Sequence, residues 1–343
     1  YTPMQLIVGP AIDYFGPRRA MTFAVLCCAI GSYIFGEATG IVAASFGRFL
    51  IGFGSAFAFV GVLKLAAIWL PVRHFALFAG FTTALGMIGA MGGNMGMMAL
   101  IKSVGWQETI YYGSVLGLIL TPIIWIVVRD HHSWTPGGED HKDFESVSSM
   151  LTGFKQIVGN GQMWLSGAVG MILFLSLSVF AEMWGIQFLE HVYPGATESQ
   201  VVSTNMMVFA GWLVGAPFAG WLSDWMKSRK RPLIIGSVLA FFLSLVVCYL
   251  PGVSLDLMRV LLFLFGFVSA VQINCFVLGR ENCPEHMSAT AIAFINMCVM
   301  VSGLTLQPLV GLLVDMSQRW RVGVAHAGDQ LNLLIDYQIK EQL

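Results

Sequence analysis

The stretch GPAIDYFGPRR, residues 9–19, closes the first apolar segment of the chain, and a related stretch, GWLSDWMKSRK, residues 220–230, closes the seventh. Both read Gly-x-x-x-Asp, with an arginine five residues beyond the aspartate and a second base directly after it. The aspartate falls at the end of a helix, the bases hold the loop at the lipid headgroups, and the glycine lets a neighbouring helix approach closely. Two such loops at equivalent places predict a chain built from two related halves.

The composition is that of a membrane protein. Of the 343 residues, 57% are hydrophobic and 11% are charged, and the mean hydropathy is +0.75. Soluble domains carry about 25% charged residues. Apolar runs of about twenty residues, long enough to cross the hydrocarbon layer, recur along the chain and are continuous rather than alternating, which predicts an all-α membrane protein. A net charge of −1 without a basic stripe gives no reason to expect nucleic acid as a partner, and the six cysteines show no metal-ligand spacing.

Charge, proline and glycine bound most of the apolar segments. We expect ten membrane-crossing segments, the first one short, at residues 1–12, 21–42, 45–70, 75–101, 107–128, 163–189, 200–222, 232–251, 257–279 and 287–314. Lysine and arginine, Arg280 among them, collect in alternate loops, which are therefore predicted to be cytoplasmic.

The longest polar stretch, residues 129–162, divides the chain into an N-terminal bundle, residues 1–128, and a C-terminal bundle, residues 163–315. Its second part places apolar residues at helical spacing, which predicts an amphipathic helix on the cytoplasmic membrane surface. The alternative is that this part begins the next spanning helix. Residues 316–343 contain no apolar run able to span, so an extramembrane tail or loop is expected there.

The first repeated loop resembles the signature loop between the second and third helices of the major facilitator superfamily, at Gly9, Asp13, Gly16, Arg18 and Arg19. The second copy departs from that pattern and has Lys227 where the first has Gly16. The run RxxxGxG that begins at Arg48 is similar to the family's fourth-helix motif, and the glycines of residues 86–93 resemble its glycine-rich fifth helix without the usual Gly-Pro pair. These glycines predict tight helix packing and some bending.

The resemblance implies two six-helix bundles that move a solute across a bacterial inner (plasma) membrane by alternating access, without a cofactor. Counted in that frame, Tyr1 falls inside helix 2, and helices 1 and 12 are expected to be absent. Two interpretations remain open, a fragment of a twelve-helix protein and a natural truncation that acts as a non-transporting membrane scaffold. Ten helices alone are not expected to transport, since losing helix 1 removes one wall of the cavity.

Several phrases are similar to phagosomal amino-acid transporters of intracellular Gram-negative bacteria, which are relatives of lysosomal dipeptide carriers. They are YTPMQL at residues 1–6, AEMWG at residues 181–185, Asn296 and QPLVG at residues 307–311. This resemblance implies a monomer that transports a small amino acid or peptide together with protons. The alternative is an organic-anion or sugar-phosphate permease. The sequence contains no His-Glu-x-x-His, Gly-x-Gly-Asp or Gly-x-Ser-x-Gly motif, so an enzyme is not expected.

Charged groups inside a bilayer are costly, so each is a candidate for substrate binding or proton coupling. Arg48 lies near the outer end of its segment, where the alternative is an interfacial anchor that snorkels outward. Lys64 lies about 24 Å further along the same helix, near the cytoplasmic end. It is predicted to contact an anion; alternatively, its side chain snorkels to the headgroups. Glu182, beside Trp184, is predicted to bind a substrate ammonium or to exchange a proton; alternatively, it is hydrated at the interface.

Two amides complete the candidate site. Asn296 and Gln307 lie about 20° apart on a helical wheel, so they are predicted to line a polar cavity or to make interhelical hydrogen bonds. In the resembled family, charged groups of the repeated loops pair when the cytoplasmic side is closed. The resemblance therefore implies a conformational gate made of Asp13, Gly16, Arg18, Arg19, Arg73, Asp224 and Arg229.

Overall fold

The computed structural model describes the backbone of residues 1–71, 74–130, 147–250 and 252–341, and it omits the side chains of residues 94–95, 147–152, 285 and 317–343 within those ranges. Throughout the described backbone the chain is helical, without strands. Nine helices in this part are long and apolar enough to cross a membrane. The prediction of an all-α membrane protein is confirmed.

The first half contains α1 (Gln5–Phe15), α2 (Pro17–Gly36), α3 (Ile41–Trp69), α4 (Phe75–Val104) and α5 (Trp106–Val127). The second half contains α7 (Gly161–Leu175), α8 (Gly185–Val192), α9 (Glu198–Trp225), α10 (Lys230–Tyr249), α11 (Leu255–Ser269), α12 (Ile273–Glu281) and α13 (Ser288–Glu341). Between the halves, α6 (Val147–Gly159) ends before Asn160, whose side chain caps α7. Short 3-10 turns lie at Thr2–Met4, Ala270–Gln272 and Glu285–Met287.

The predicted segments agree with these helices to within about six residues, but two of them are not single α-helices. In the segment expected at 163–189, the π-helix η4 (Ser176–Trp184) separates α7 from α8. In the segment expected at 257–279, the 3-10 turn Ala270–Gln272 separates α11 from α12. In α13 the part long and apolar enough to cross a membrane is Ser288–Met316. The extramembrane position expected for residues 316–343 stays a prediction, as does the membrane-surface position of α6.

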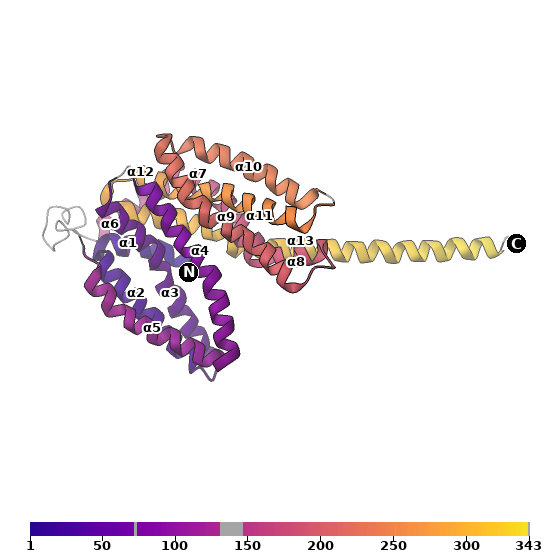
Figure 1. The fold of residues 1–343 in the computed structure, drawn as a ribbon, viewed down its shortest axis with the longest axis horizontal. Coiled ribbons are helices and arrows are strands. Elements are labelled where there is room, and N and C mark those ends of the chain that lie inside the picture. Colours follow the sequence, from indigo (N-terminus) through magenta and orange to yellow (C-terminus); the bar gives the residue numbers. More distant parts are fainter. Residues whose placement is uncertain (72–73, 131–146, 251, 342–343) are drawn as a thin grey trace.

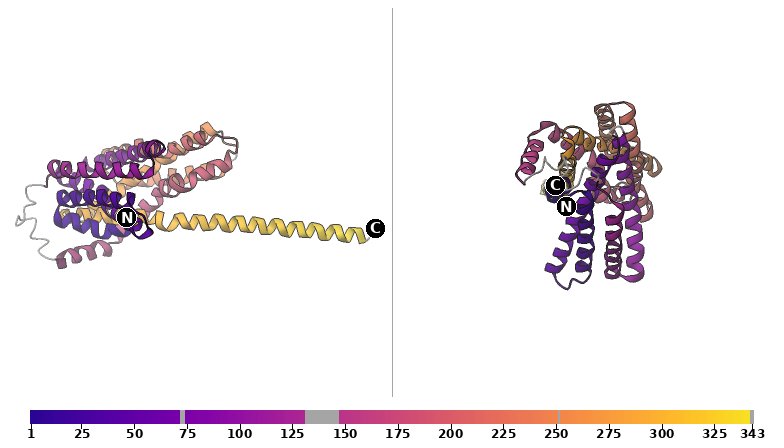
Figure 2. Two further views of the ribbon diagram at one scale, coloured as in Figure 1. Left: turned by 90° about the horizontal axis from the view of Figure 1, so that it is seen from below. Right: turned by 90° about the vertical axis from the view of Figure 1, so that its left-hand side faces the viewer.

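Figure 1 shows the two halves lying against each other at the end that carries α1, α6 and α12, and diverging toward the opposite end. Figure 2 shows the same helices from two further sides. We call these two ends the closed end and the open end. At the closed end a single buried apolar cluster takes side chains from both halves, including Val8, Leu63, Phe75, Ile292 and Ile295. The halves therefore share one core there.

Glycines allow this contact. A Cβ on Gly9 of α1 would lie 2.6 Å from the Cα atom of Thr290 in α13, and a Cβ on Gly80 of α4 would lie 2.3 Å from the carbonyl oxygen of Ala216 in α9. A Cβ on Gly220 of α9 would lie 2.3 Å from the carbonyl oxygen of Ala76 in α4. Real Cβ atoms do not approach that near, so the two repeated-loop glycines permit the helix contacts that the sequence predicted.

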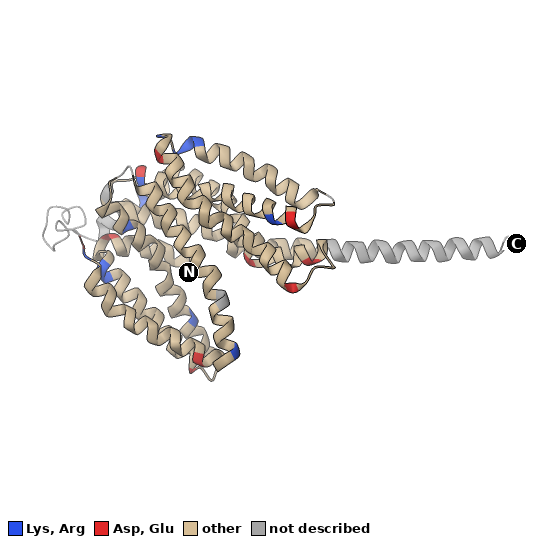
Figure 3. Ribbon diagram, in the orientation of Figure 1, with Lys and Arg blue, Asp and Glu red and all other residues tan. Residues whose placement is uncertain are grey.

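The other predicted glycine packing is wrong in this structure. A Cβ at Gly86, Gly89, Gly92 or Gly93 would have nothing within 4 Å. These glycines lie beyond Gly80 toward the open end of α4, where the halves diverge (Figure 1). Figure 3 shows that the charged residues lie mainly near the ends of the helices, with long uncharged stretches between them, as the hydrocarbon layer requires.

Candidate functional site

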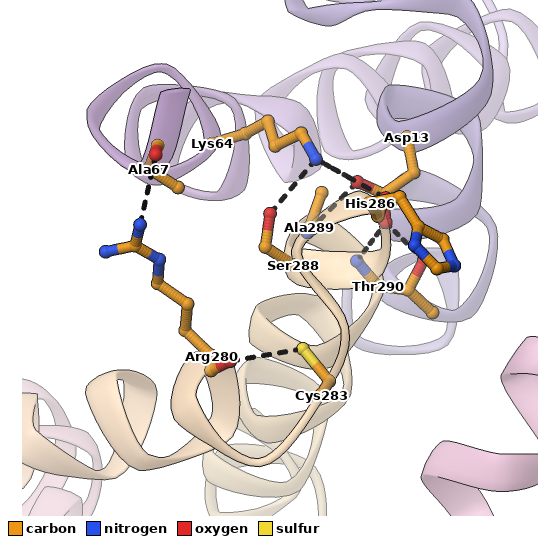
Figure 4. Close-up of polar contacts among 9 residues, drawn as sticks. All are labelled: Asp13, Lys64, Ala67, Arg280, Cys283, His286, Ser288, Ala289 and Thr290. Carbon is orange, nitrogen blue, oxygen red and sulfur yellow. Dashed lines mark hydrogen bonds and ion pairs between the residues drawn. The ribbon is translucent and has the colours of Figure 1, made fainter. Parts of the chain in front are cut away.

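At the closed end, Asp13 of the first half caps a helix of the second half (Figure 4). Its Oδ1 atom accepts a hydrogen bond from the backbone nitrogen of Ala289 at 3.1 Å. Its Oδ2 atom accepts from the backbone nitrogen of Thr290 at 2.7 Å and from the Thr290 hydroxyl at 2.6 Å. The first N–H groups of a helix have no partner within the helix, and the N-terminus attracts negative charge. The carboxylate therefore satisfies the start of α13 from across the interface.

Lys64 completes this cluster. Its Nζ atom lies 2.7 Å from Asp13 Oδ1 and donates to the Ser288 hydroxyl at 3.0 Å and to the His286 carbonyl at 3.5 Å. Its side chain is 3% exposed, so the snorkelling alternative is wrong. A lysine buried this deeply requires a paired charge. The structure thus places Lys64 beside Asp13, a residue of the predicted gate.

Arg280 of α12 reaches in the opposite direction, from the second half to the first. Its Nη2 atom donates to the Ala67 carbonyl near the end of α3 at 3.0 Å, and its guanidinium stacks over the Phe75 ring with the centroid 4.3 Å away. A cation at a helix C-terminus is stabilised by the helix dipole. The sequence indicates only a loop position for Arg280, since nothing in its local pattern shows which helix end it meets.

The remaining residues of the predicted gate stay within their own half, as far as the described residues show. Arg18 donates to the Trp125 carbonyl at 2.8 Å and stacks on the Trp125 ring. Arg229 binds Asp224 at 2.6 Å and Glu281 at 2.9 Å, all in the second half. Gly16, with φ of 87°, joins α1 to α2, and Arg19 follows it within α2. Arg73 lies outside the described residues.

One face of α3 points at the second half. Phe59 contacts Phe276 of α12, with ring centroids 4.9 Å apart. Arg48 lies eleven residues earlier, about 20° away around the helix and about 16 Å nearer the open end. Gly52 and Ser55 lie between them on the same face. We call Arg48, Gly52, Ser55 and Phe59 the inner face of α3.

Arg48 is exposed, and its guanidinium lies over the Phe35 ring at 4.3 Å from the centroid.

Beside the inner face, three polar side chains meet where α1 touches α13. Asn296 Nδ2 donates to the Tyr1 hydroxyl at 3.3 Å, and Gln5 Nε2 donates to the Ala56 carbonyl at 3.1 Å. The backbone nitrogen of Tyr1 lies 3.8 Å from the position of a Cβ on Gly52. Gln5 is fully buried, and its Oε1 atom has no hydrogen-bond partner among the described residues.

The successive elements α7, η4 and α8 form one span, Gly161–Val192, which we call helix 7. Its residue Glu182 is exposed, and no described residue forms a hydrogen bond or ion pair with the carboxylate. The Trp184 ring packs 3.2 Å from the position of a Cβ on Gly311 of α13. Gln307 donates to the Ser178 carbonyl of η4. The structure therefore does not bring Asn296 and Gln307 to one partner, because each amide makes its own hydrogen bond to a different helix.

The match to a known family covers most of the chain. Residues 1–306 match the model of the Major Facilitator Superfamily. The chain belongs to this family. It is therefore a multi-pass membrane transporter, as expected.

Two curated relatives illustrate the match. The "Probable galactarate/D-glucarate transporter GudP" of Escherichia coli (strain K12) is 20% identical over 363 residues, which cover 96% of this chain and 79% of that protein. The "Probable sulfoacetate transporter SauU" of Cupriavidus necator is 24% identical over 254 residues, which cover 71% of this chain and 58% of that protein. These relatives give no support to the expected resemblance to amino-acid and dipeptide carriers.

Two solved structures share the superfamily fold. The proton:xylose symporter XylE has a TM-score of 0.62 at 16% identity, over 92% of this chain and 78% of that one. The human organic anion transporter MFSD10 has a TM-score of 0.62 at 14% identity, over 88% of this chain and 74% of that one. At these identities the likeness concerns the fold alone.

Proposed function

We propose that this major facilitator protein is a secondary active transporter of a small organic anion, which binds beside the inner face of α3. The observation that carries the proposal is the position of Arg48. Its guanidinium is exposed on the face whose other end meets the second half through Phe59 and Phe276. A substrate held there would touch both halves, as alternating access requires.

The chemistry of the neighbouring groups favours an anion. An arginine binds carboxylate, sulfonate or phosphate groups through paired hydrogen bonds, and one kept within a membrane span marks a ligand path. Lys64, the second intramembrane base of α3, already pairs with Asp13. Arg48 is therefore the cation on α3 that remains for a substrate.

Beside the inner face, Tyr1 suits the uncharged part of such a substrate. It is exposed, its hydroxyl can both donate and accept, and the buried Asn296 amide donates to that hydroxyl. Galactarate, glucarate and sulfoacetate, named for the relatives, are small molecules with acid groups, and the first two also carry hydroxyls. This agreement supports the anion reading.

The cluster of Asp13, Lys64 and Thr290 supports a role for the closed end as the gate. The hydrogen bonds of Asp13 with Thr290 and of Lys64 with Ser288 join the two halves and are buried, so they must break before that end opens, whereas the Lys64–Asp13 ion pair lies within the first half. Glu182 is the carboxylate we assign to proton coupling, since it is exposed on a spanning helix without a described partner. The protein works as a monomer in a bacterial plasma membrane in this proposal.

A second candidate substrate, an amino acid or small peptide, rests on Glu182. An exposed carboxylate late in helix 7 would bind a substrate ammonium while Arg48 binds the carboxylate. The two candidate substrates require different roles of Glu182. An amino acid or peptide would bind this carboxylate through its ammonium group, whereas an organic acid without an ammonium group would not bind it directly.

The test is uptake into proteoliposomes by the protein produced from its complete reading frame, with labelled glucarate, sulfoacetate, amino acids and dipeptides, with and without a proton gradient. We expect gradient-stimulated uptake of the acids, a large loss in Arg48→Gln and a partial one in Arg48→Lys. Arg259→Gln is the matched control, because Arg259 begins α11 and already pairs with Asp256 at 2.8 Å. Uptake of amino acids or dipeptides alone overturns the anion proposal.

A further inference from the structure

Helix 7 carries an uncommon backbone element at its centre. Between α7 and α8, the nine residues Ser176–Trp184 form a π-helix. A π turn closes its hydrogen bond one residue later than an α turn, and π-helices in proteins are mostly single-turn bulges. Glu182 and Trp184, both predicted site residues, lie on this element. Their direction depends on the segment keeping its π-helical register.

Two side-chain amides hold the carbonyl groups of this segment. The Nδ2 atom of Asn205, on α9, donates to the Ala181 carbonyl at 2.8 Å. The Nε2 atom of Gln307, on α13, donates to the Ser178 carbonyl. These donors belong to two different helices, so the π-helical segment is held by hydrogen bonds from two sides.

The residue that follows the segment is a glycine, and its lack of a side chain leaves room for the Asn205 amide. A Cβ on Gly185 would lie 2.2 Å from the Asn205 Oδ1 atom, so any side chain there would displace Asn205. The start of the segment has partners of its own. The Ser176 hydroxyl accepts from the Trp212 indole at 3.1 Å, and the Ser178 and Ser302 hydroxyls lie 2.9 Å apart.

We infer that Asn205 and Gln307 are positioning residues for the transport site, because they hold helix 7 in the π-helical register that turns Glu182 and Trp184 to their observed positions. If the segment relaxed into a regular α-helix, each following side chain would rotate by about 100° relative to the preceding part. The hydrogen bonds from the two amides stabilise the carbonyl groups in the positions that they have in the π-helical form. Removing the amides therefore favours the α-helical form.

This inference rests on the proposed function for its consequence, since Glu182 is assigned there to proton coupling. Its structural content does not depend on the substrate. Asn205→Leu and Gln307→Met keep the size of each side chain and remove the donor. Gly185→Ala leaves both amides in the sequence and pushes Asn205 away. All three changes are expected to turn residue 182 in the same way.

The direct test measures the direction of residue 182. In a Glu182→Cys background, a charged thiol reagent that does not cross membranes is added, and the labelled peptide is quantified by mass spectrometry. We expect rapid labelling, and at least a fivefold slower rate after Asn205→Leu, Gln307→Met or Gly185→Ala. Asn274→Leu is the matched control, because this buried amide donates to the Val271 carbonyl three residues earlier, at 3.1 Å, and not to the π-helical segment. It should leave the rate unchanged.

The outcomes separate the two proposals. An unchanged labelling rate in all three variants, with thermal stability retained, overturns the positioning role whatever the protein transports. A slower rate in variants of a protein that takes up no organic anion supports the positioning role and overturns the proposed substrate. Transport activity, measured as uptake, provides a second test of the positioning role. Glu182→Gln combined with Gln307→Met should lose no more activity than Glu182→Gln alone, whereas independent effects would multiply.

Discussion

The Asp13 carboxylate of the first half lies 2.7 Å from the backbone nitrogen of Thr290, the third residue of the second half's α13. The contact joins residues that are 277 positions apart in the sequence, and it is buried. Lys64 lies on the other side of the carboxylate at 2.7 Å, so the negative charge is shared between a helix N-terminus and a lysine. This carboxylate is therefore one of the groups that hold this end of the protein closed.

Asp13→Asn is expected to favour separation of the halves at the closed end. The amide leaves Lys64 without its counter-charge, and removing one partner of a buried ion pair costs about 3–5 kcal/mol. Spin labels at Phe15 and Trp225, both exposed at this end, would report the distance between the halves. The control is Asp224→Asn, since Asp224 pairs with Arg229 inside its own half. Equal distance changes in the two variants would contradict the prediction.

Gly80→Ala and Gly86→Ala form a matched pair on α4. The new methyl group at position 80 would meet the Ala216 carbonyl at 2.3 Å, whereas the one at position 86 has nothing within 4 Å. Overpacking costs about 1–3 kcal/mol, so Gly80→Ala should lower the melting temperature measured in detergent. Gly86→Ala should leave it unchanged or raise it slightly, because alanine is the better helix former. A larger loss at position 86 would contradict the assignment of the interface.

The rate at which the Cys283 thiol is labelled should depend on whether the closed end is open or shut. Burial, together with the nearby negative charge of Asp13, raises the pKa of this thiol to about 12. Only the thiolate reacts with a maleimide, so labelling near pH 8 should be slow and should accelerate about tenfold for each added pH unit. The rate, followed by mass spectrometry, should rise in Asp13→Asn, which removes one cause of the shift and opens this end. Fast labelling of the unmodified protein at pH 8 would refute the expectation.

Arg280→Lys should weaken the contact between the two halves at the closed end without changing the net charge. A lysine cannot both stack flat on the Phe75 ring and direct a second donor to the Ala67 carbonyl. We expect a closed-end distance intermediate between those of the parent protein and Asp13→Asn, measured with the same spin labels. Arg259→Lys serves as the control, because Arg259 is at the open end and pairs with Asp256. A distance unchanged from the parent protein would show that the guanidinium is dispensable.

Helix positions follow closely from the sequence because each span must bury its backbone polar groups in about twenty apolar residues. The repeat containing Asp13 and Asp224 also indicated correctly where each glycine allows a helix to approach. The sequence does not indicate that Asp13 crosses to α13 while Asp224 binds Arg229, since both copies have the same spacing. That difference arises from tertiary contacts that no local pattern encodes.

The candidate site shows the same limit. Lys64 was expected near the end of its helix, where a long side chain reaches the headgroups, but its actual partner lies in α1. The apolar sequence of Ser176–Trp184 gives no signal for a π-helix, and the two amides that donate to its carbonyl groups, Asn205 and Gln307, come from other helices. Thr290, Ser288 and Arg280 are ordinary by type, and only the fold reveals their contacts.

The different partners of Asp13 and Asp224 mean that the two repeated loops have different tasks. The first joins the halves through the start of α13, and the second braces a single half through Arg229 and Glu281. The halves are therefore not interchangeable. A chain assembled from two first halves would repeat Asp13 without the start of α13 that it caps, and one assembled from two second halves would repeat the start of α13 without Asp13.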